Sequence, residues 1–442
     1  MATSICDSRG AYGQLIAHFQ TLDMGTKAMT SLPQTGTDWT KLKARLRDMK
    51  QGDYAWKDGR LPVYIYYYTE ELLRVSQEAY TEFFTENALG AHAFPSVAQL
   101  EREVIEMGID LLGGGPQAGG TFTSGGTESI FLAFKTARDW ARKEKGIDRP
   151  KVVAAFSAHA AADKAASYLG MEVVRTPLRE DFRADVGLFE AAIDERTCMI
   201  YASAPGYPHG VIDPIEEIGA LARKRGLWLH IDACVGGFLA PFARDIGYPI
   251  PPFDLSVPGV SSLSADLHKY GFAAKPASLL LFADREYQKY QGFEFSSWPR
   301  GTYVTKTFQG SRAAGPVASA WAVMNTLGRA GYRDIARVIM GTRDRLIAGV
   351  EHIKGLRVIR PTDLCILMYD SIDPHVDIYA VADRMGKKGW FVSKSITPKA
   401  IHVALNPSVA PALNDYLANL AEAVEQVRST KIGRNGRSPH SI

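Results

Sequence analysis

Short apolar segments alternate with helical segments between residues 151 and 232, and this alternation restricts the fold more than any other feature of the sequence. We predict strands at residues 152–156, 172–175, 198–203 and 227–232, and helices at residues 159–169, 186–193 and 214–224. Strands that are apolar along almost their whole length are typical of a parallel sheet that is covered on both faces. The sequence therefore predicts the α/β class, with a mostly parallel sheet and helices on both faces.

Polar residues stand at or just beyond the ends of three of these strands. His159 follows the first strand closely, Ser203 ends the third and Asp232 ends the fourth. Ligands of open α/β sheets bind at the carboxyl ends of the strands. We therefore expect these three side chains to share one binding site.

The pattern changes after residue 330. We predict helices at residues 332–353, 377–388 and 411–428, and short strands at residues 356–359, 364–369, 390–393 and 400–404. This mixture predicts a smaller α+β domain at the C-terminal end. We accordingly divide the chain into an N-terminal segment (1–90), a large cofactor-binding domain (91–330), a small domain (331–430) and a basic tail (431–442).

The composition argues against several classes of protein. A formal net charge of +3 over 442 residues is too small to indicate nucleic-acid binding. No apolar run approaches the ~18 residues that span a bilayer, and the first residues lack the basic start and apolar core of a signal peptide. The four cysteines are far apart and show no metal-ligand spacing, so we expect free thiols, no metal site and a cytoplasmic location.

Lys269 is the leading candidate for a catalytic residue. It follows His268 and stands in a predicted loop between a β-prone serine-rich run (residues 261–264) and an apolar strand (residues 277–282). Burial disfavours the charged form of a lysine, so we expect Lys269 to lose its proton and become a nucleophilic amine. A single lysine is more often a solvated surface charge, so the residues upstream decide between the two interpretations.

A glycine-rich segment predicts an anion-binding site. Residues 113–120 form a glycine-rich loop, and residues 123–129 lead from it into a helix that extends to Lys143. The free N–H groups and the dipole of a helix N-terminus attract phosphate. Gly126 and Thr127 are the candidate ligands, and a simple helix cap by Thr127 is the alternative. We expect Ser96 to cap the preceding helix, at residues 97–112.

These candidates together match the requirements of catalysis by pyridoxal 5′-phosphate (PLP). Lys269 would form the Schiff base with the cofactor, and Asp232 would keep the pyridine nitrogen protonated. His159 would cover the ring face, and Ser203 would lie near the ring oxygen. Taken singly, Asp232, His159 and Ser203 each have an alternative role without a cofactor. Asp232 could be a strand-end cap, His159 a helix N-terminal residue and Ser203 a core hydroxyl.

The phosphate group of PLP would be bound by Gly126 and Thr127, with His268 beside the attachment lysine. All parts of a PLP site thus occur in one sequence, in a consistent order, which makes a chance coincidence improbable. The combination predicts a PLP-dependent enzyme. A scaffold that has lost the cofactor is the alternative, and the intact set of Lys269, Asp232 and His159 argues against it.

The stretch from about residue 66 to residue 312 closely resembles the sphingosine-1-phosphate lyases, in the group II decarboxylase family of fold-type I PLP enzymes. The resemblance covers about three quarters of the chain and is looser in the C-terminal region. The matching motifs are residues 123–130, 157–161, 208–214, 230–238, 264–271 and 310–312.

The resemblance implies a homodimer with the cofactor at the interface, in which each subunit completes the other's site. Gly310 and Ser311 would reach the PLP phosphate of the other subunit, and Tyr207 would come from that subunit as a candidate acid or base. The substrate would be a long-chain amino alcohol phosphate, cleaved between C2 and C3 to phosphoethanolamine and a fatty aldehyde. Tyr66 and Lys275 match the positions that contact the substrate phosphate.

One loop departs from the family pattern. The family's Asn-Pro-Leu-His loop is replaced here by residues 87–90, which end in Gly90, and the nearest histidine is His92. Either His92 substitutes from a shifted loop or the pocket takes another head group. A carbon–carbon lyase is therefore the first hypothesis, and an amino-acid decarboxylase with the same cofactor site is the second.

Overall fold

The computed structural model describes residues 31–90 and 92–430, and it divides into two compact units, one ending at Asp53 and the other beginning at Tyr54. In the first unit, α2 (Trp39–Met49) is followed by the 3₁₀ turn η1 (Lys50–Gly52). The carboxylate of Asp38 caps α2 by accepting the N–H of Thr40 at 3.0 Å. The second unit contains the predicted sheet, the C-terminal elements and every candidate site residue. The basic tail lies outside the described residues.

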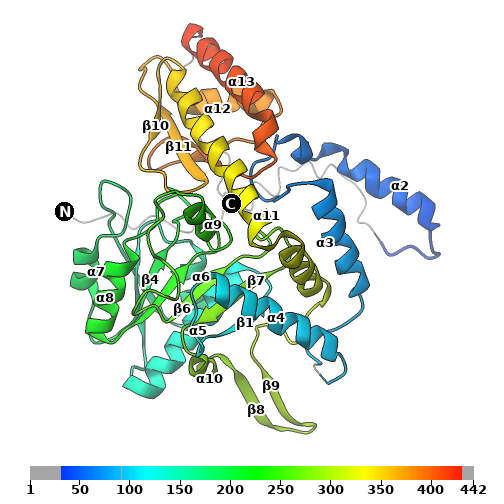
Figure 1. The fold of residues 1–442 in the computed structure, drawn as a ribbon, viewed down its shortest axis with the longest axis vertical. Coiled ribbons are helices and arrows are strands. Elements are labelled where there is room, and N and C mark those ends of the chain that lie inside the picture. The colour runs from blue at the N-terminus through cyan, green and yellow to red at the C-terminus, as the bar shows by residue number, and fades with distance from the viewer. Residues whose placement is uncertain (1–30, 91, 431–442) are drawn as a thin grey trace. The chain divides into compact units, whose positions relative to one another are not determined.

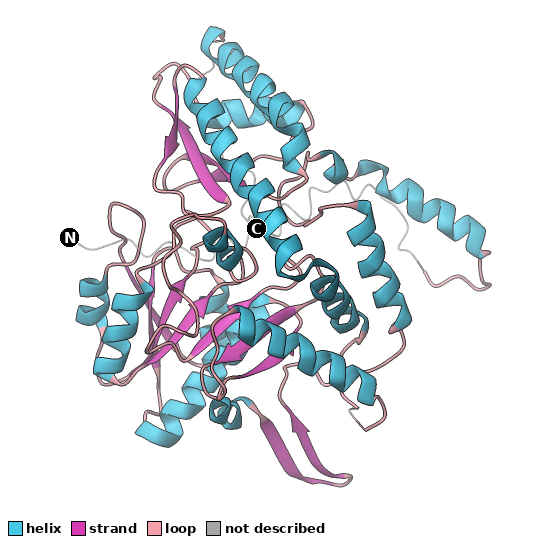
Figure 2. Ribbon diagram, viewed as in Figure 1, coloured by secondary structure: helices cyan, strands magenta, loops and turns pink. Residues whose placement is uncertain are grey.

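A seven-stranded sheet forms the centre of the second unit, with the strand order β1-β7-β6-β5-β4-β2-β3. Figure 2 shows the strands in magenta and the helices around them in cyan. Its strands pair in parallel except for β7, which runs antiparallel to both β6 and β1. The predicted α/β class and mostly parallel sheet are thus confirmed. The strands are β1 (Gly119–Thr123), β2 (Lys151–Ala155), β3 (Glu172–Thr176), β4 (Thr197–Ser203), β5 (Trp228–Asp232), β6 (Ser262–Ala265) and β7 (Ser278–Phe282).

Helices cover both faces of this sheet (Figure 1). Alternate residues of β2 enter two different apolar clusters: Val152 and Ala154 pack with α5 and α6, whereas Val153 and Ala155 pack with α7 and α8. Successive side chains of a strand point to opposite faces, so both faces are buried. The helices around the sheet are α3 (Glu70–Glu82), α4 (Pro95–Leu111), α5 (Gly126–Lys145), α6 (Ala161–Leu169), α7 (Val186–Ala192), α8 (Ile215–Arg225), α9 (Ala240–Asp245) and α10 (Gln288–Gln291).

The C-terminal elements form a four-stranded antiparallel sheet with helices, as the α+β pattern predicts. The helix α11 (Gly315–His352) leads into them and is interrupted at Gly328, whose φ of 53° is not helical. The predicted domain boundaries stay a prediction. The remaining elements are β10 (Leu356–Ile359), β11 (Ile366–Ser371), α12 (Ile378–Lys387), β12 (Ser393–Ser395), β13 (Ala400–Ala404) and α13 (Val409–Ser429).

The strand predicted at residues 390–393 is wrong, because only Ser393 belongs to a strand. The preceding residues are held by another part of the chain. The guanidinium of Arg60 lies 4.0 Å from the ring centroid of Trp390, and the N–H of Phe391 donates to the carbonyl of Arg60 at 2.9 Å. Because of these contacts, the apolar residues before Ser393 pack near Arg60. Their hydrophobicity therefore reflects packing and not sheet pairing.

The predicted helix cap by Ser96 is wrong, and so is the alternative interpretation of Thr127 as a cap. No side chain caps α4; Pro95 starts this helix and Phe94 is its N-cap residue, and proline's fixed φ suits the first turn. In α5 the N-cap is Gly125 with a φ of 149°, so Thr127 lies within the first turn and its side chain forms no cap bond. The glycine-rich loop is shorter than predicted, because its last two residues begin β1.

A β-hairpin of β8 (Phe293–Trp298) and β9 (Gly301–Thr305) pairs apart from the main sheet (Figure 1). Two short 3₁₀ turns complete the second unit, η2 (Trp56–Asp58) and η3 (Arg285–Tyr287). In the described part of the chain, every helix is too short or too polar to span a membrane. Cys198, Cys234 and Cys365 are buried free thiols, whereas Cys6 lies outside the described residues. The cytoplasmic location stays a prediction.

Candidate active site

A pocket of about 560 Å³ lies at the carboxyl ends of the parallel strands. It is lined by residues that are far apart in the sequence, from the loop before α3 to the loop before β7. Among them are ten of the predicted site residues: Tyr66, Gly126, Thr127, His159, Ser203, Tyr207, Asp232, His268, Lys269 and Lys275. The residues that the strand ends predicted to share a site thus lie together at this edge of the sheet.

Asp232 is a buried carboxylate with a defined set of donors. Its Oδ2 accepts a hydrogen bond from the hydroxyl of Tyr201 at 2.5 Å, and its Oδ1 accepts the N–H of Cys234 at 3.0 Å. Burial by itself would raise the pKa of Asp232, but the nearby imidazole of His159 and these hydrogen bonds bring it below the ordinary value. Asp232 is therefore an ionised carboxylate that suits a protonated ring nitrogen.

Strand register fixes the neighbours of Asp232. In the parallel pairing of β4 with β5, Ser203 lies opposite Asp232, and in the pairing of β5 with β6, Ser264 lies opposite Asp232. The N–H of Ser203 donates to the buried carboxylate of Asp213 at 2.8 Å. The hydroxyl of Ser203 thus stands beside Asp232 at the edge of the pocket.

Two histidines are oriented by backbone groups. The Nδ1 of His159 accepts the N–H of Ala161 at 3.1 Å, and the Nδ1 of His268 accepts the N–H of Ala277 at 3.2 Å. Because Nδ1 is the acceptor in each ring, the neutral tautomer carries its proton on Nε2. Burial is the main cause that lowers the pKa of His268, and the charges of Lys269 and Lys275 lower it further. A neutral His268 with an Nε2–H is a suitable donor to phosphate.

The start of α5 is built for close approach of an anion. A side chain at Gly126 would place its Cβ 2.6 Å from the Sγ of Cys234, so only glycine fits there. The carboxylate of Glu128 stabilises this turn, because it accepts the N–H of Ser124 at 2.6 Å and the N–H of Phe308 at 2.8 Å. With these groups satisfied, the free N–H groups of the first turn remain for a phosphate.

Lys269 is paired, which corrects the expectation of a neutral amine. Its Nζ lies 2.8 Å from the Oδ2 of Asp266, a carboxylate that is only 2% exposed. Burial by itself would lower the pKa of Lys269, but the negative charge of Asp266 outweighs it, so the pKa is raised. In this state Lys269 is an ammonium ion. The expectation of a neutral amine took account of burial but not of the negative charge of Asp266.

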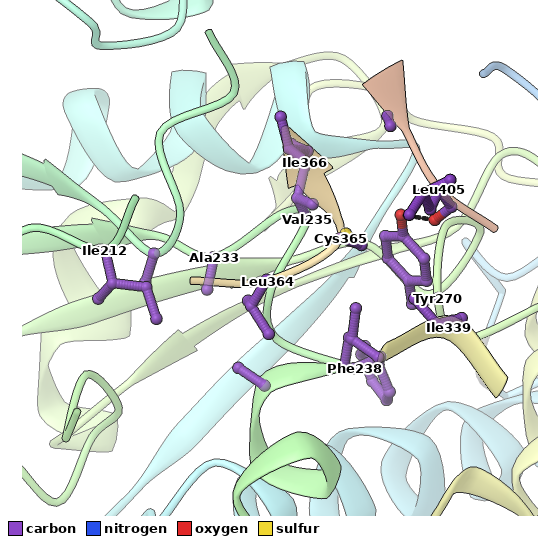
Figure 3. Packing of buried hydrophobic residues seen from close by; sticks show 14 of the residues in the cluster. Ile212, Ala233, Val235, Phe238, Tyr270, Ile339, Leu364, Cys365, Ile366 and Leu405 are labelled. Carbon is purple, nitrogen blue, oxygen red and sulfur yellow. Dashed lines mark hydrogen bonds between the residues drawn. The ribbon is translucent and has the colours of Figure 1, made fainter. Parts of the chain in front are cut away.

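The apolar floor of the pocket fixes the backbone around Lys269. Val235, which lines the pocket, belongs to the same cluster of buried residues as Phe238 and Tyr270 (Figure 3). The hydroxyl of Tyr270, the residue after Lys269, donates to the carbonyl of Leu405 at 2.6 Å. This bond connects the lysine loop to the C-terminal sheet region.

Tyr66, Tyr207 and Lys275 also line the pocket. The Nζ of Lys275 lies 5.9 Å from the ring centroid of Tyr66, and no carboxylate among the described residues forms an ion pair with it. Tyr207 lines the pocket of its own chain, which differs from the expectation that it comes from the other subunit. Burial raises the pKa of Tyr207, so its phenol stays protonated near neutral pH.

Three predicted residues do not line this pocket: Gly310, Ser311 and His92. Gly310 lines a separate cavity of about 930 Å³, together with Ala88 and Leu89 of the departing loop. This loop and the Gly310 segment are joined, because the Oδ1 of Asn87 accepts the N–H of Arg312 at 3.1 Å. His92 is exposed and lines neither cavity.

The residues of the first pocket fit PLP. The turn at Gly126 and the Nε2–H of His268 would hold the phosphate, and the ionised Asp232 would hold the ring nitrogen. Lys269 stands in the same pocket as the attachment point, and the buried Oδ1 of Asp266 has no hydrogen-bond partner among the described residues. A buried polar atom without a partner marks a place where a bound group is expected.

Sequence reasoning missed three residues of the site. Tyr201 stands two positions before Ser203 on β4, and the two-residue period of a strand puts both on one face. Glu128 stands three positions after the N-cap of α5, the position whose side chain turns back to the N-terminus in a capping box. Asp266 stands three positions before Lys269 in the same loop, and this spacing is the signal that could have found it.

Comparison with known proteins agrees with this geometry. Residues 29–362 match the pyridoxal-dependent decarboxylase conserved domain. Sphingosine-1-phosphate lyase of Oryza sativa subsp. japonica is 41% identical over 408 residues, which are 90% of this chain and 75% of that protein. The structure of sphingosine-1-phosphate lyase of Burkholderia pseudomallei superposes with a TM-score of 0.87 at 35% identity, covering 91% of this chain and 94% of the other.

A relative of a different name is more distant. The probable L-tyrosine/L-aspartate decarboxylase of Methanothermobacter thermautotrophicus is 33% identical over 358 residues, which are 80% of this chain and 94% of that protein. The residues that match the family domain include Lys269, Asp232 and the glycine turn at Gly126. The chain therefore belongs to the pyridoxal-dependent decarboxylase family, and PLP is its cofactor.

Proposed function

We propose that this protein is a PLP-dependent carbon–carbon lyase that cleaves a long-chain amino alcohol phosphate of the sphingosine-1-phosphate type. The products are phosphoethanolamine and a fatty aldehyde. The observation that carries the proposal is Lys275, a cation in the PLP pocket for which the described residues supply no ion-pair partner. The lyase names of the rice and Burkholderia relatives support the same substrate class.

The residues of the pocket divide the chemistry between them. When bound, PLP withdraws electrons from the substrate carbon that carries the amine. Asp232 would keep the proton on the pyridine nitrogen. The hydrogen bonds that Asp232 accepts from the hydroxyl of Tyr201 and the N–H of Cys234 keep it ionised. Tyr207, a protonated phenol in the same pocket, is the candidate donor of the proton that the amine product gains.

Substrate phosphate would bind at the mouth of the pocket. Lys275 is exposed there, and Tyr66 holds its hydroxyl protonated because burial raises its pKa. An ammonium and a phenol are both hydrogen-bond donors, so together they match a phosphate. The end of the substrate that carries phosphate is thereby anchored apart from the Gly126 turn, which serves the phosphate of the cofactor.

A product assay tests this function against the decarboxylase alternative. Purified protein is incubated with sphingoid phosphates and, separately, with tyrosine, aspartate and glutamate, and both aldehyde and CO₂ are measured. Aldehyde from the sphingoid phosphate is the expected result. Release of CO₂ from an amino acid, without aldehyde from the phosphate, would establish the decarboxylase to which the methanogen relative points.

Replacing Lys275 with alanine should weaken binding of the phosphorylated substrate. A charge-assisted hydrogen bond is worth roughly 1.5–3 kcal/mol, so we expect KM to rise by about 10- to 150-fold. Covalent attachment of PLP at Lys269 should stay intact, as measured by absorbance beyond 400 nm. The matched control is Lys164→Ala, because the Nζ of Lys164 also lies 5.9 Å from a tyrosine ring, that of Tyr168, but outside the pocket. An unchanged KM in Lys275→Ala would exclude this phosphate anchor.

We also propose a homodimer in which Gly310 and Ser311 complete the PLP phosphate site of the other subunit. Two observations support this proposal. Gly310 and Ser311 lie outside the pocket of their own chain, and in the segment between β9 and α11 Gly310 is partly exposed and Ser311 is exposed. A C₂ dimer uses the same surface twice, so each subunit gives and receives one such segment.

Mixing two inactive variants tests the shared site. Lys269→Ala lacks the attachment lysine, and Ser311→Trp places a bulky ring at the segment offered to the partner. After the two proteins are dissociated and reassociated together, one site of each hybrid dimer has both an intact lysine and an intact serine. Random pairing should then restore about a quarter of the wild-type sites, measured as turnover. No recovery in a mixture that sizing and mass spectrometry show to contain hybrids would mean that each chain builds its own site.

A further inference from the structure

The attachment lysine is paired with a buried carboxylate. The Oδ2 of Asp266 lies 2.8 Å from the Nζ of Lys269, and Asp266 directly follows β6, so the rigid sheet fixes its position. Its other oxygen, Oδ1, is buried without a hydrogen bond among the described residues. Both carboxylate oxygens lie 3.0 Å from where a Cβ on Gly126 would stand. The carboxylate of Asp266 thus lies between the attachment lysine and the turn at Gly126.

A buried carboxylate in such a place is expensive unless a cation neutralises it. Lys269 is the cation within hydrogen-bond distance, and its side chain is 26% exposed to the pocket. His268 is a poorer partner, because its Nε2 lies 3.7 Å from the Oδ2 of Asp266 and its pKa is lowered, chiefly by burial. Lys269 is therefore the partner that the position of Asp266 favours.

We propose that Asp266 is a positioning residue that holds the free side chain of Lys269 as an ammonium ion against the pocket floor. Covalent attachment of PLP forms a carbon–nitrogen bond from the neutral amine and releases one water, so the ammonium must first give up a proton. Asp266 thereby sets the pH range in which Lys269 reacts. The inference rests on the proposed role of Lys269 as the attachment point.

Other ionisable groups face Lys269, and none of them is a closer anion. Besides Asp266, ionisable groups near its ammonium come from β5 and the loop after it, the segment before α3, the loop after β4, the loop of Lys269 itself and the loop before β11. These groups are Cys234, Tyr66, Tyr207, Asp232, His268, Lys275 and Cys365. The thiols and phenols among them are neutral near pH 7, because burial raises the pKa of each. Asp232 is occupied by Tyr201 and Cys234, which leaves Asp266 as the controlling charge.

The test measures the reactivity of Lys269 without PLP or substrate. The full-length apoenzyme is treated with fluorodinitrobenzene, a neutral reagent that arylates neutral amines and releases fluoride, and each lysine is quantified by peptide mass spectrometry over a range of pH. In Asp266→Asn, the labelling rate of Lys269 near neutral pH should rise about 10-fold or more, because loss of a charge at this distance lowers a lysine pKa by about one unit or more.

Lys275 is the internal control, since it stands in the same pocket without a carboxylate partner among the described residues. Its labelling should change by less than about twofold in Asp266→Asn. Equal rises at Lys269 and Lys275 would indicate a loosened pocket, and an unchanged Lys269 would show that Asp266 does not control it; either result overturns the proposal.

A measurement on the wild-type apoenzyme does not depend on the folding of a variant. Lys269 should begin to react at a higher pH than Lys275, because Asp266 raises the pKa of one while burial and the charge of Lys269 lower the pKa of the other. The reverse order would contradict the proposal. Neither measurement involves lyase turnover, so failure here is distinguishable from failure of the proposed function.

Discussion

Replacing Lys269 with alanine should abolish both covalent attachment of PLP and turnover. Lys269 and Lys275 both line the pocket, and the Nζ of Lys275 lies 5.9 Å from the ring centroid of Tyr66. We expect the absorbance beyond 400 nm to disappear in Lys269→Ala and product formation to fall to the background rate. PLP content after gel filtration and aldehyde release measure the two effects.

Lys269→Arg is the matched control for this variant. Arginine keeps a positive charge next to Asp266 but forms no covalent bond with PLP, so it should be as inactive as alanine. The thermal midpoint should separate the two: alanine leaves the buried Asp266 without its cation, whereas arginine retains the ion pair. Turnover in either variant at the wild-type rate would remove Lys269 from the mechanism.

The parts of the site that the sequence predicted are those fixed by strand ends. Asp232 and Ser203 each end an apolar strand, and parallel pairing of β4 with β5 brings them opposite each other. Strand boundaries are visible in the sequence because burial on both faces demands continuous apolar residues. The edge where ligands bind follows from the same pattern, so this much of the site needs no tertiary information.

The parts that the sequence did not predict depend on the folded chain: on the course of a loop, on the direction of a strand and on contacts between distant segments. The ion pair of Asp266 with Lys269 reversed the expected charge of the lysine, because a neighbouring anion outweighs desolvation. The antiparallel direction of β7 was likewise invisible, since an apolar strand of five residues reads the same in either direction. The segment around Trp390 looked like a strand because packing against Arg60 requires the same apolar character.

The loop that departs from the family pattern also gains a physical explanation only in the folded chain. Its Asn87 is bonded to the backbone of Arg312, whose guanidinium forms two hydrogen bonds of 3.0 Å with the carboxylate of Glu101. Gly90 has no positive φ, and a Cβ there would make only ordinary contacts. The glycine is therefore not required by backbone conformation.

Replacing Asp232 with asparagine should leave PLP bound but remove most of the turnover. Asparagine has nearly the same shape and still accepts the N–H of Cys234, so the pocket and Lys269 are preserved. It carries no negative charge, and the pyridine nitrogen is no longer held protonated. We expect kcat to fall by more than about 10²-fold, which corresponds to roughly 3 kcal/mol of transition-state stabilisation.

Two further variants show whether charge is the cause. Asp254→Asn neutralises another buried carboxylate, which pairs with Arg244 outside the pocket, and should keep wild-type turnover. Tyr201→Phe removes one donor to Asp232 without removing its charge, so its loss of kcat should be smaller than that of Asp232→Asn. Since Tyr201 also lowers the pKa of Asp232, its removal should move the acidic limb of the kcat profile to higher pH. Near-normal turnover in Asp232→Asn, with PLP content unchanged, would mean that another group keeps the ring protonated.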